Sequence, residues 1–202
     1  MANHSAAASA PLATGVLLLA AGFSRRFGGT KLEAMLHNGD TVIARTLIQL
    51  RGTAAPLRIV TRPELQTLLL ASGAQTDELV LCTDADLGMG HTLAAGMRAL
   101  PAWDACLVCL ADMPFIRTAT YAQLLQGLRR DRITVPVFNG IRGNPVGFGA
   151  QWFEALRHCT GDAGARELVR ANAQQIDGIP VEDPAVLKDI DTPADLQRHQ
   201  TD

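Results

Sequence analysis

Several features of membrane proteins and nucleic-acid-binding proteins are missing from this 202-residue sequence. No apolar run reaches the roughly 18 residues that a membrane-spanning helix needs. Basic residues do not outnumber acidic ones: the formal net charge is -2, whereas a general nucleic-acid surface usually has a basic balance. We therefore expect no membrane and no nucleic acid among the partners, and we expect the substrates to be small molecules.

Cysteine is also scarce, and its spacing does not suit a metal site. The C-x-x-C formed by Cys106 and Cys109 lies in an apolar run typical of a strand, where an offset of three places the two thiols on opposite faces. No second C-x-x-C and no histidine pair completes a zinc site. Together with Cys82 and Cys159, these residues are interpreted as reduced structural thiols, which predicts a cytoplasmic protein.

The N-terminal stretch resembles a secretory signal only superficially. Small residues precede the apolar run at residues 15–21, but no Lys or Arg does. Cleavage after that run would also remove the glycine-rich loop that follows it. We therefore expect residues 1–13 to be a disordered leader and residues 14–202 to form a single domain, because this length suffices for one α/β domain with a substantial core.

The stretch LAAGFSRRFGGTK, from Leu19 to Lys31, is the most informative part of the chain. A buried strand ends at Gly22 and leads into a glycine-rich loop that carries Arg25, Arg26 and Lys31. Backbone N–H groups can approach phosphate oxygens closely where side chains are missing, while Arg offers a planar fork and Lys a mobile charge. The residue order fits neither a P-loop nor a dinucleotide fingerprint. We interpret the loop as a polyphosphate site; an ordinary strand-to-helix loop with solvated cations is the alternative.

Apolar runs and amphipathic segments alternate along the rest of the chain. Strands are expected at residues 57–61, 78–82, 105–110, 133–138 and 175–180, with helical patterns between most of them. This alternation predicts an α/β fold, a three-layer α/β/α sandwich with a mainly parallel, Rossmann-like sheet. Ligands of such sheets bind at the carboxyl ends of the strands. The functional loops are therefore expected directly after strands, at residues 22–31, 83–91, 112–114, 139–145 and 189–191.

Three aspartates are candidates for a metal site. Asp112 follows a central strand and would lie beside the phosphate loop if the two strands are neighbours. Mg²⁺ is usually held by one or two carboxylates, with water and phosphate oxygens as its other ligands. Asp189 and Asp191 offer the second carboxylate, since alternation in an extended strand points both to one side. We favour Asp112 with Asp191; helix capping is the competing role for both.

Three glycine-containing segments are candidates for substrate contacts. Gly88–Leu93 places two glycines at a helix start, where backbone N–H groups suit a nucleotide, although a tight turn is equally consistent with it. Asn139–Pro145 could form the wall of an acceptor site or a plain β-turn. In the segment Gly161–Arg166, the arginine could reach an anionic acceptor, while Asp162 could simply cap the helix that holds it.

Taken in order, these stretches resemble the nucleotidyltransferase family of the molybdenum cofactor cytidylyltransferases and guanylyltransferases. The cytidylyl opening motif, LAAGxSxRxGxxK, matches Leu19 to Lys31 at every fixed position. The D-M-P sequence of the family matches residues 112–114, and its glycine motif resembles residues 88–93. Its GNPV, GDxGAR and DIDTPEDL segments resemble residues 143–146, 161–166 and 189–196, with Ala194 in place of Glu. The resemblance spans nearly the whole chain.

This resemblance implies transfer of CMP from CTP to the phosphate of molybdopterin or molybdenum cofactor, with release of pyrophosphate and with Mg²⁺ as cofactor. The guanylyl enzymes read LAGG and carry Asp before the Lys, whereas this chain has Ala21 and Thr30, which favours CTP over GTP. A molybdenum hydroxylase or its maturation factor is the implied protein partner. The alternatives are GTP or another phosphorylated acceptor, a carrier of molybdenum cofactor without catalysis and, more weakly, an oxidoreductase, since the sequence contains no dinucleotide fingerprint.

The implied roles of individual residues fall into four groups. The catalytic residues are Arg26, Lys31 and Asp112. The metal ligands are Asp112 and Asp191. Nucleotide contacts are expected from Leu19, Ala20, Ala21, Gly22, Ser24, Gly28, Gly90 and Thr92. Acceptor contacts are expected from Asn144, Pro145, Asp162 and Arg166.

Overall fold

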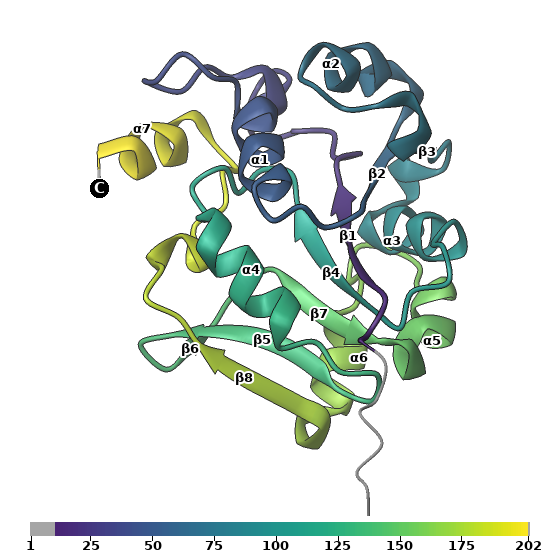
Figure 1. Cartoon of the computed structure of the whole chain (residues 1–202). Helices are drawn as coiled ribbons and strands as arrows, with labels where there is room; N and C mark the ends of the chain where they lie inside the picture. Colours follow the sequence, from purple (N-terminus) through teal and green to yellow (C-terminus); the bar gives the residue numbers. More distant parts are fainter. Residues whose placement is uncertain (1–10, 202) are drawn as a thin grey trace, which may run out of the picture.

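The structure is a computed structural model that describes residues 11–201 (Figure 1). Most of the expected leader, residues 1–10, lies outside the described residues. Ala13 lies inside them: its N–H donates to the Asp104 carboxylate at 2.9 Å, and its carbonyl accepts from the Asp104 N–H at 2.6 Å. Throughout this part of the chain, each helix is too short or too polar to cross a bilayer.

A single mixed sheet forms the centre of the described chain (Figure 1). Four strands at one side are parallel to one another, and β8 is parallel to β5. β7 runs antiparallel to both β4 and β5, and β6 runs antiparallel to β5. The prediction of a mainly parallel sheet is thus confirmed, with the antiparallel strands β6 and β7 as additions. In sheet order the strands are β3 (Leu79–Leu81), β2 (Leu57–Thr61), β1 (Thr14–Leu19), β4 (Ala105–Leu110), β7 (Val146–Gly149), β5 (Ile133–Phe138) and β6 (Ile141–Arg142), with β8 (Ile176–Pro180) also paired with β5.

The two central strands, β1 and β4, are buried on both faces. This explains why their sequences are continuous apolar runs rather than alternating ones. Leu18 and Cys109 belong to the hydrophobic core on one face, and Leu17 and Cys106 to the core on the other. The opposite-face prediction for the two cysteines of the C-x-x-C is therefore confirmed.

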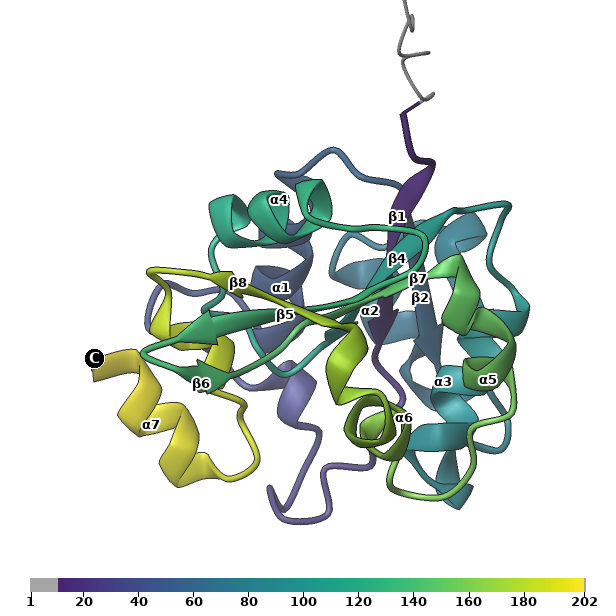
Figure 2. The same ribbon diagram turned by 90° about the horizontal axis from the view of Figure 1, so that it is seen from below.

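Helices cover both faces of the sheet, which confirms the three-layer sandwich (Figures 1 and 2). On one face lie α1 (Val42–Arg51), α2 (Gln66–Ala71) and α4 (Thr118–Gln126); on the other lie α3 (Met89–Arg98), α5 (Phe153–Arg157) and α6 (Arg166–Ala171). The last helix, α7 (Pro193–Thr201), packs Leu196 against the first of these cores. Short 3-10 turns occupy Lys31–Glu33, Pro63–Leu65, Thr76–Glu78, Ala85–Leu87, Ala150–Trp152, Ala173–Gln175 and Pro184–Leu187.

Buried hydrogen bonds fix the loop that follows β4. The Thr46 hydroxyl, which is fully buried in α1, donates to the carbonyl of Ala111 at 3.1 Å. The Ala111 N–H donates to the carbonyl of Leu19 at 3.1 Å, which continues the β1–β4 ladder by one residue. The backbone before Asp112 is therefore held from two sides, and the Asp112 side chain emerges beside the end of β1.

The segment that contains Asp189 and Asp191 does not form the extended strand that their alternation predicts. A 3-10 turn ends at Leu187, and no regular element includes residues 188–191. Instead, Ile190 is fully buried in the core, and its N–H donates to the carbonyl of Asp112 at 3.0 Å. One buried residue thus places the two flanking aspartates, Asp189 and Asp191, beside Asp112.

A buried carboxylate, Asp183, joins the start of α4 to the turn that leads into this segment. It is 3% exposed and accepts hydrogen bonds from the Arg117 N–H at 3.0 Å, the Thr120 hydroxyl at 2.6 Å and the Ala185 N–H at 3.2 Å. Burial alone would raise the pKa of Asp183, but these hydrogen bonds and the Arg117 charge outweigh burial and hold the pKa below its ordinary value.

We expect Asp183→Asn to lower the free energy of unfolding by about 1–3 kcal/mol at pH 7, because the amide cannot accept all three hydrogen bonds. The folded pKa lies below the unfolded value of about 3.9, so the contribution of the carboxylate is complete above that pH and is lost as the pH falls through the folded pKa. The difference between variant and wild type should therefore shrink below about pH 4. Urea unfolding across this pH range measures it.

The control for this comparison is Asp131→Asn. Asp131 forms an exposed ion pair with Arg129 at 3.7 Å. Exposed pairs contribute little, so this variant should change the free energy of unfolding by less than about 0.5 kcal/mol. Equal losses in the two variants would contradict the role assigned to Asp183.

Candidate active site

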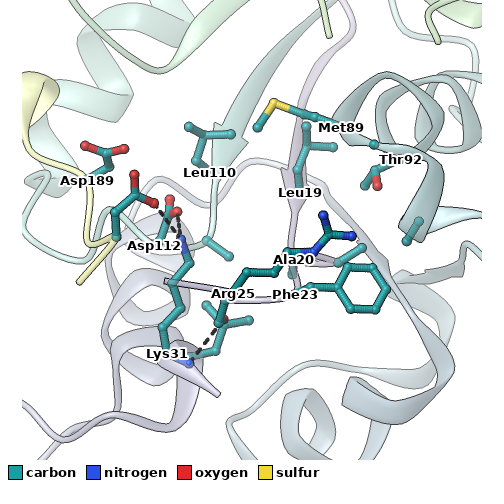
Figure 3. Close-up of a pocket in the computed structure, with 18 of the residues that line it drawn as sticks. Leu19, Ala20, Phe23, Arg25, Lys31, Met89, Thr92, Leu110, Asp112 and Asp189 are labelled. Atoms are coloured by element: carbon teal, nitrogen blue, oxygen red, sulfur yellow. Dashed lines mark hydrogen bonds and ion pairs between the residues drawn. The ribbon is translucent and has the colours of Figure 1, made fainter. Parts of the chain in front are cut away.

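A pocket of about 440 Å³ lies at the carboxyl ends of β1 and β4 (Figure 3). Each of the five loops that the strand pattern singled out contributes lining residues. In Figure 3, Lys31, Asp112 and Asp189 lie at one end of the pocket, and Phe23, Met89 and Thr92 at the other. The pocket therefore has a charged end and a more apolar end, which suits a ligand with a phosphate part and a ring part.

An ion-pair network occupies the charged end. Lys31 Nζ lies 2.5 Å from Asp112 Oδ2 and 3.4 Å from Asp191 Oδ1. Arg26 donates to the other oxygen of Asp191 at 2.6 Å. The Lys31 and Asp112 side chains are only 12% and 17% exposed, whereas Arg26 is 73% exposed. Lys31 is thus the shielded centre of the network, and Arg26 is its solvent-facing edge.

Burial and charge act against each other in this network. Burial alone would lower the pKa of Lys31, but the charges and hydrogen bonds of Asp112 and Asp191 outweigh it, so the pKa lies above its ordinary value. Burial raises the pKa of Asp112; Lys31 opposes this shift and the charge of Asp189 adds to it. Lys31 therefore stays protonated at neutral pH, and its charge favours the ionised form of Asp112.

The loop after β1 folds back so that Lys31 reaches the pocket. Ser24 and Gly28 adopt positive φ values, 52° and 77°. The Ser24 hydroxyl accepts a hydrogen bond from the Lys31 N–H at 3.3 Å, and its carbonyl accepts from the Phe27 N–H at 2.9 Å. Gly28 tolerates this conformation because it lacks a Cβ. The glycine thus shapes the loop.

The carboxylates at the charged end fit a divalent cation. Asp112 Oδ1 is buried and has no hydrogen-bond partner within the described chain, which is costly unless a ligand supplies one. Asp189 and Asp191 line the same pocket. Residues 11–201 contain no cluster of three or more His, Cys, Asp or Glu side chains arranged around a metal position. One or two carboxylates nevertheless suffice for Mg²⁺ when phosphate and water complete its ligand sphere.

Most of the predicted site residues line the pocket together. The charged end contains Arg26, Lys31, Asp112 and Asp191. The rest of the lining includes Leu19, Ala20, Ala21, Gly22, Ser24, Thr92, Asn144, Asp162 and Arg166. Residues as far apart in the sequence as Ser24 and Arg166, which are separated by 142 positions, therefore meet through the strand order rather than through local sequence.

Three predicted site residues are not brought to the pocket. Gly28 lies further along the loop and acts through its backbone conformation. Pro145 leads into β7, and only its neighbour Asn144 lines the pocket. Gly90 is the clearest correction, because its N–H donates to the carbonyl of Gly161 at 2.7 Å and is not directed to a ligand.

Sequence reasoning overlooked several residues of the pocket, among them Phe23, Asp86 and Met89. The Phe23 ring lies 4.6 Å from the Arg62 guanidinium and 5.9 Å from that of Arg25. Phe23 stands at a variable position of the opening motif, so the motif does not single it out. Its place directly after the first strand was the available signal, since loops at that edge bind ligands.

The comparisons with known proteins agree with this geometry. The sequence model of the family described as MobA-like NTP transferase domain matches residues 16–176. The chain is 29% identical over 199 residues to nicotine blue oxidoreductase of Paenarthrobacter nicotinovorans, covering 93% of this chain and 96% of that protein. It is 28% identical over 187 residues to the purine catabolism protein PucB of Bacillus subtilis, covering 88% and 91%.

Solved structures show the same fold. Rv0371c from Mycobacterium tuberculosis superposes with a TM-score of 0.82 at 24% identity, covering 95% of this chain and 98% of that one. A second structure of Rv0371c, in complex with manganese, gives a TM-score of 0.76 at 23% identity, covering 95% and 99%. The two sequence relatives have different names, and neither name states an acceptor.

Replacing Lys31 by Met removes the charge that competes with a divalent cation for Asp112, at similar side-chain length. In the absence of nucleotide, we expect Lys31→Met to bind Mn²⁺ about tenfold more tightly than wild type, a difference of about 1.4 kcal/mol. Electron paramagnetic resonance titration of free Mn²⁺ at pH 8 measures this affinity. The double variant Lys31→Met/Asp112→Asn should lose the gain, and an unchanged affinity in Lys31→Met would contradict the arrangement.

Proposed function

This chain belongs to the MobA-like NTP transferase family, and we propose that it transfers CMP from CTP to the phosphate of molybdopterin or molybdenum cofactor and releases pyrophosphate. The observation that carries the proposal is the shielded Lys31–Asp112 pair at the end of the glycine-rich loop. A polyphosphate can bind the Lys31 ammonium only if a second cation replaces Lys31 as the partner of the Asp112 carboxylate. Such an exchange is what a site for a metal–nucleotide complex requires.

In the proposed reaction, a phosphate oxygen of the acceptor attacks the α-phosphorus of CTP. The bond from that phosphorus to the oxygen bridging to the β-phosphate breaks, and pyrophosphate leaves with the electron pair. The acceptor phosphate is already ionised at neutral pH, so no general base is needed. Arg26 and Lys31 line the pocket where they can hold the leaving pyrophosphate and offset the charge that grows on it.

Asp112, together with Asp191 or Asp189, would hold Mg²⁺. When bound, the ion offsets phosphate charge and orients the phosphate oxygens. The partnerless oxygen of Asp112 supports this assignment. The mycobacterial protein Rv0371c, which shares the fold, has been solved with manganese, and this also favours a divalent ion.

The acceptor would lie on the side formed by Asn144, Asp162 and Arg166. Arg166 is exposed, and no carboxylate within the described chain forms an ion pair with it, so its guanidinium is available to an anionic group. The Asp162 carboxylate could accept hydrogen bonds from the N–H groups of a pterin ring. With Arg166 for a phosphate and Asp162 for ring N–H groups, the site supports an acceptor that carries both a phosphate and a nitrogen-containing ring, rather than a simple sugar phosphate.

The proposal extends to where the reaction occurs and what receives the product. Cys82, Cys106 and Cys109 are buried and unpaired, which supports a reducing compartment such as the cytoplasm. Burial raises the pKa of Cys106, so this thiol stays protonated and unreactive. A molybdenum hydroxylase or its maturation factor would take the product.

A pyrophosphate-release assay tests the proposed function. CTP, GTP, ATP and UTP are each offered with Mg²⁺ and molybdopterin, and we expect release with CTP above the others. Asp112→Ala should abolish turnover, because loss of the carboxylate removes both the metal ligand and the partner of Lys31. Release by Asp112→Ala close to that of wild type would refute the metal assignment.

The control variant in this assay is Asp131→Ala, which removes an exposed carboxylate that lies just before β5 and does not line the pocket. It should release pyrophosphate at the wild-type rate. If wild type releases none with any nucleotide while still binding molybdenum cofactor, the carrier function replaces the transferase. Release of pyrophosphate with GTP instead of CTP would support the transferase reaction but would contradict CTP as the nucleotide substrate.

Ala21 is the residue expected to favour the smaller base. Its methyl group lines the pocket and is 3% exposed, so a purine approaching the backbone there would meet it. We expect Ala21→Gly to reduce the preference for CTP over GTP, measured as the ratio of kcat/KM values, by about 10-fold, as for one methyl-sized change in a pocket. Ala94→Gly, at another buried alanine in α3, controls for lost stability and should leave the ratio unchanged.

A further inference from the structure

The start of α3 is tied to the loop at residues 160–164 by two reciprocal hydrogen bonds. The Gly90 N–H donates to the carbonyl of Gly161 at 2.7 Å. In return, the Gly161 N–H donates to Nδ1 of the His91 ring at 3.3 Å. Both polar groups of one loop residue are thus satisfied by two consecutive residues of the helix, and His91 Nδ1 must be unprotonated to accept.

The two glycines of this helix start are required by close contact with the same loop. A Cβ on Gly90 would lie 2.4 Å from the carbonyl oxygen of Thr160. A Cβ on Gly88 would lie 2.5 Å from the carbonyl group of Gly161 and 2.6 Å from Oδ1 of Asp162, and Gly88 also has a φ of 114°. The missing side chains therefore make room for protein backbone.

The loop held in this way carries the candidate acceptor residues. Asp162 directly follows Gly161, and Arg166 begins α6 four residues later; both line the pocket. No residue of the six-residue helix α6 is fully buried, so its core packing anchors it weakly. Leu168 and Val169 pack α6 against the core, and the contacts with α3 constrain the loop before it, which carries Asp162 and leads into Arg166.

The same helix start also faces the other end of the pocket. Met89 and Thr92 line the pocket, whereas Gly90 and His91 contact the loop. One turn of α3 thus touches both the nucleotide side and the acceptor side.

We propose that His91 is a positioning residue for the acceptor: with Gly90, it clamps the loop at residues 160–164 and so holds Asp162 and Arg166 in place. The glycines at the start of α3 serve this clamp rather than a cradle for nucleotide phosphates. The inference depends on the proposed function for the assignment of the acceptor side, but the clamp itself can be measured independently.

Three variants test the clamp by steady-state kinetics and by hydrogen exchange of the segment 160–166. His91→Ala removes the acceptor of the Gly161 N–H, and His91→Asn keeps an oxygen near the position of Nδ1. We expect His91→Ala to raise the KM for molybdopterin about 5- to 10-fold, the loss expected for about one hydrogen bond. The KM for CTP and the kcat at saturating acceptor should stay within about twofold, and exchange in the segment should become faster.

His91→Asn should restore most of the acceptor KM and the slow exchange. His158→Ala is the matched control, since His158 is an exposed histidine that pairs with Glu154 away from the pocket, and it should change neither readout. A raised KM for CTP with an unchanged KM for molybdopterin would overturn the proposal in favour of nucleotide binding at this helix start. Unchanged exchange in His91→Ala would also overturn it.

The failure of the proposed function looks different. If wild type releases no pyrophosphate under any condition, the transferase assignment fails, and the exchange measurement alone decides the clamp. Faster exchange at residues 160–166 in His91→Ala and recovery in His91→Asn would then support the clamp, and equal exchange in all variants would refute it.

Discussion

The contact between Lys31 and Asp112 is the interaction on which the site depends. It joins two residues 81 positions apart at 2.5 Å, in a place where both are largely shielded from water. Removing one partner of such a pair costs on the order of 3–5 kcal/mol unless another charge replaces it. Hydrogen bonds fix the backbone on both sides of Asp112. The Thr46 hydroxyl donates to the carbonyl of Ala111, and the N–H of the buried Ile190 donates to the carbonyl of Asp112.

The adjacency of β1 and β4 brings these two residues together. Both strands are fully apolar because the sheet buries both of their faces, and such strands lie at the centre of a parallel sheet. Sequence reasoning could therefore predict that Asp112 and the glycine-rich loop share one edge. It could also predict that the loops after strands form the pocket, because this rule needs only the positions where apolar runs end.

Long-range packing was beyond the reach of the sequence. From the local sequence, the Gly90 N–H could have donated to a ligand. In the structure it donates to the carbonyl of Gly161, which lies 71 residues later. Residues 187–191 alternate like a strand, yet burial of Ile190 and its bond to Asp112 fix them in irregular backbone. The contact of Phe23 with Arg62 likewise depends on the neighbour that β2 supplies. In each case a partner from a distant segment decides between alternatives that are locally equivalent.

The charges at the pocket also constrain which kind of ligand it can hold. Lys31 and Arg26 form ion pairs with Asp112 and Asp191, so these two cations and two carboxylates largely neutralise each other before any ligand arrives. A triphosphate alone would draw the cations away and leave buried carboxylate charge uncompensated, while a divalent ion alone would meet ammonium and guanidinium groups. Only a ligand that brings both signs together leaves every charge paired. Under the proposed function, the network would therefore favour the metal–nucleotide complex over either component, and this selection would follow from electrostatics without any further residue.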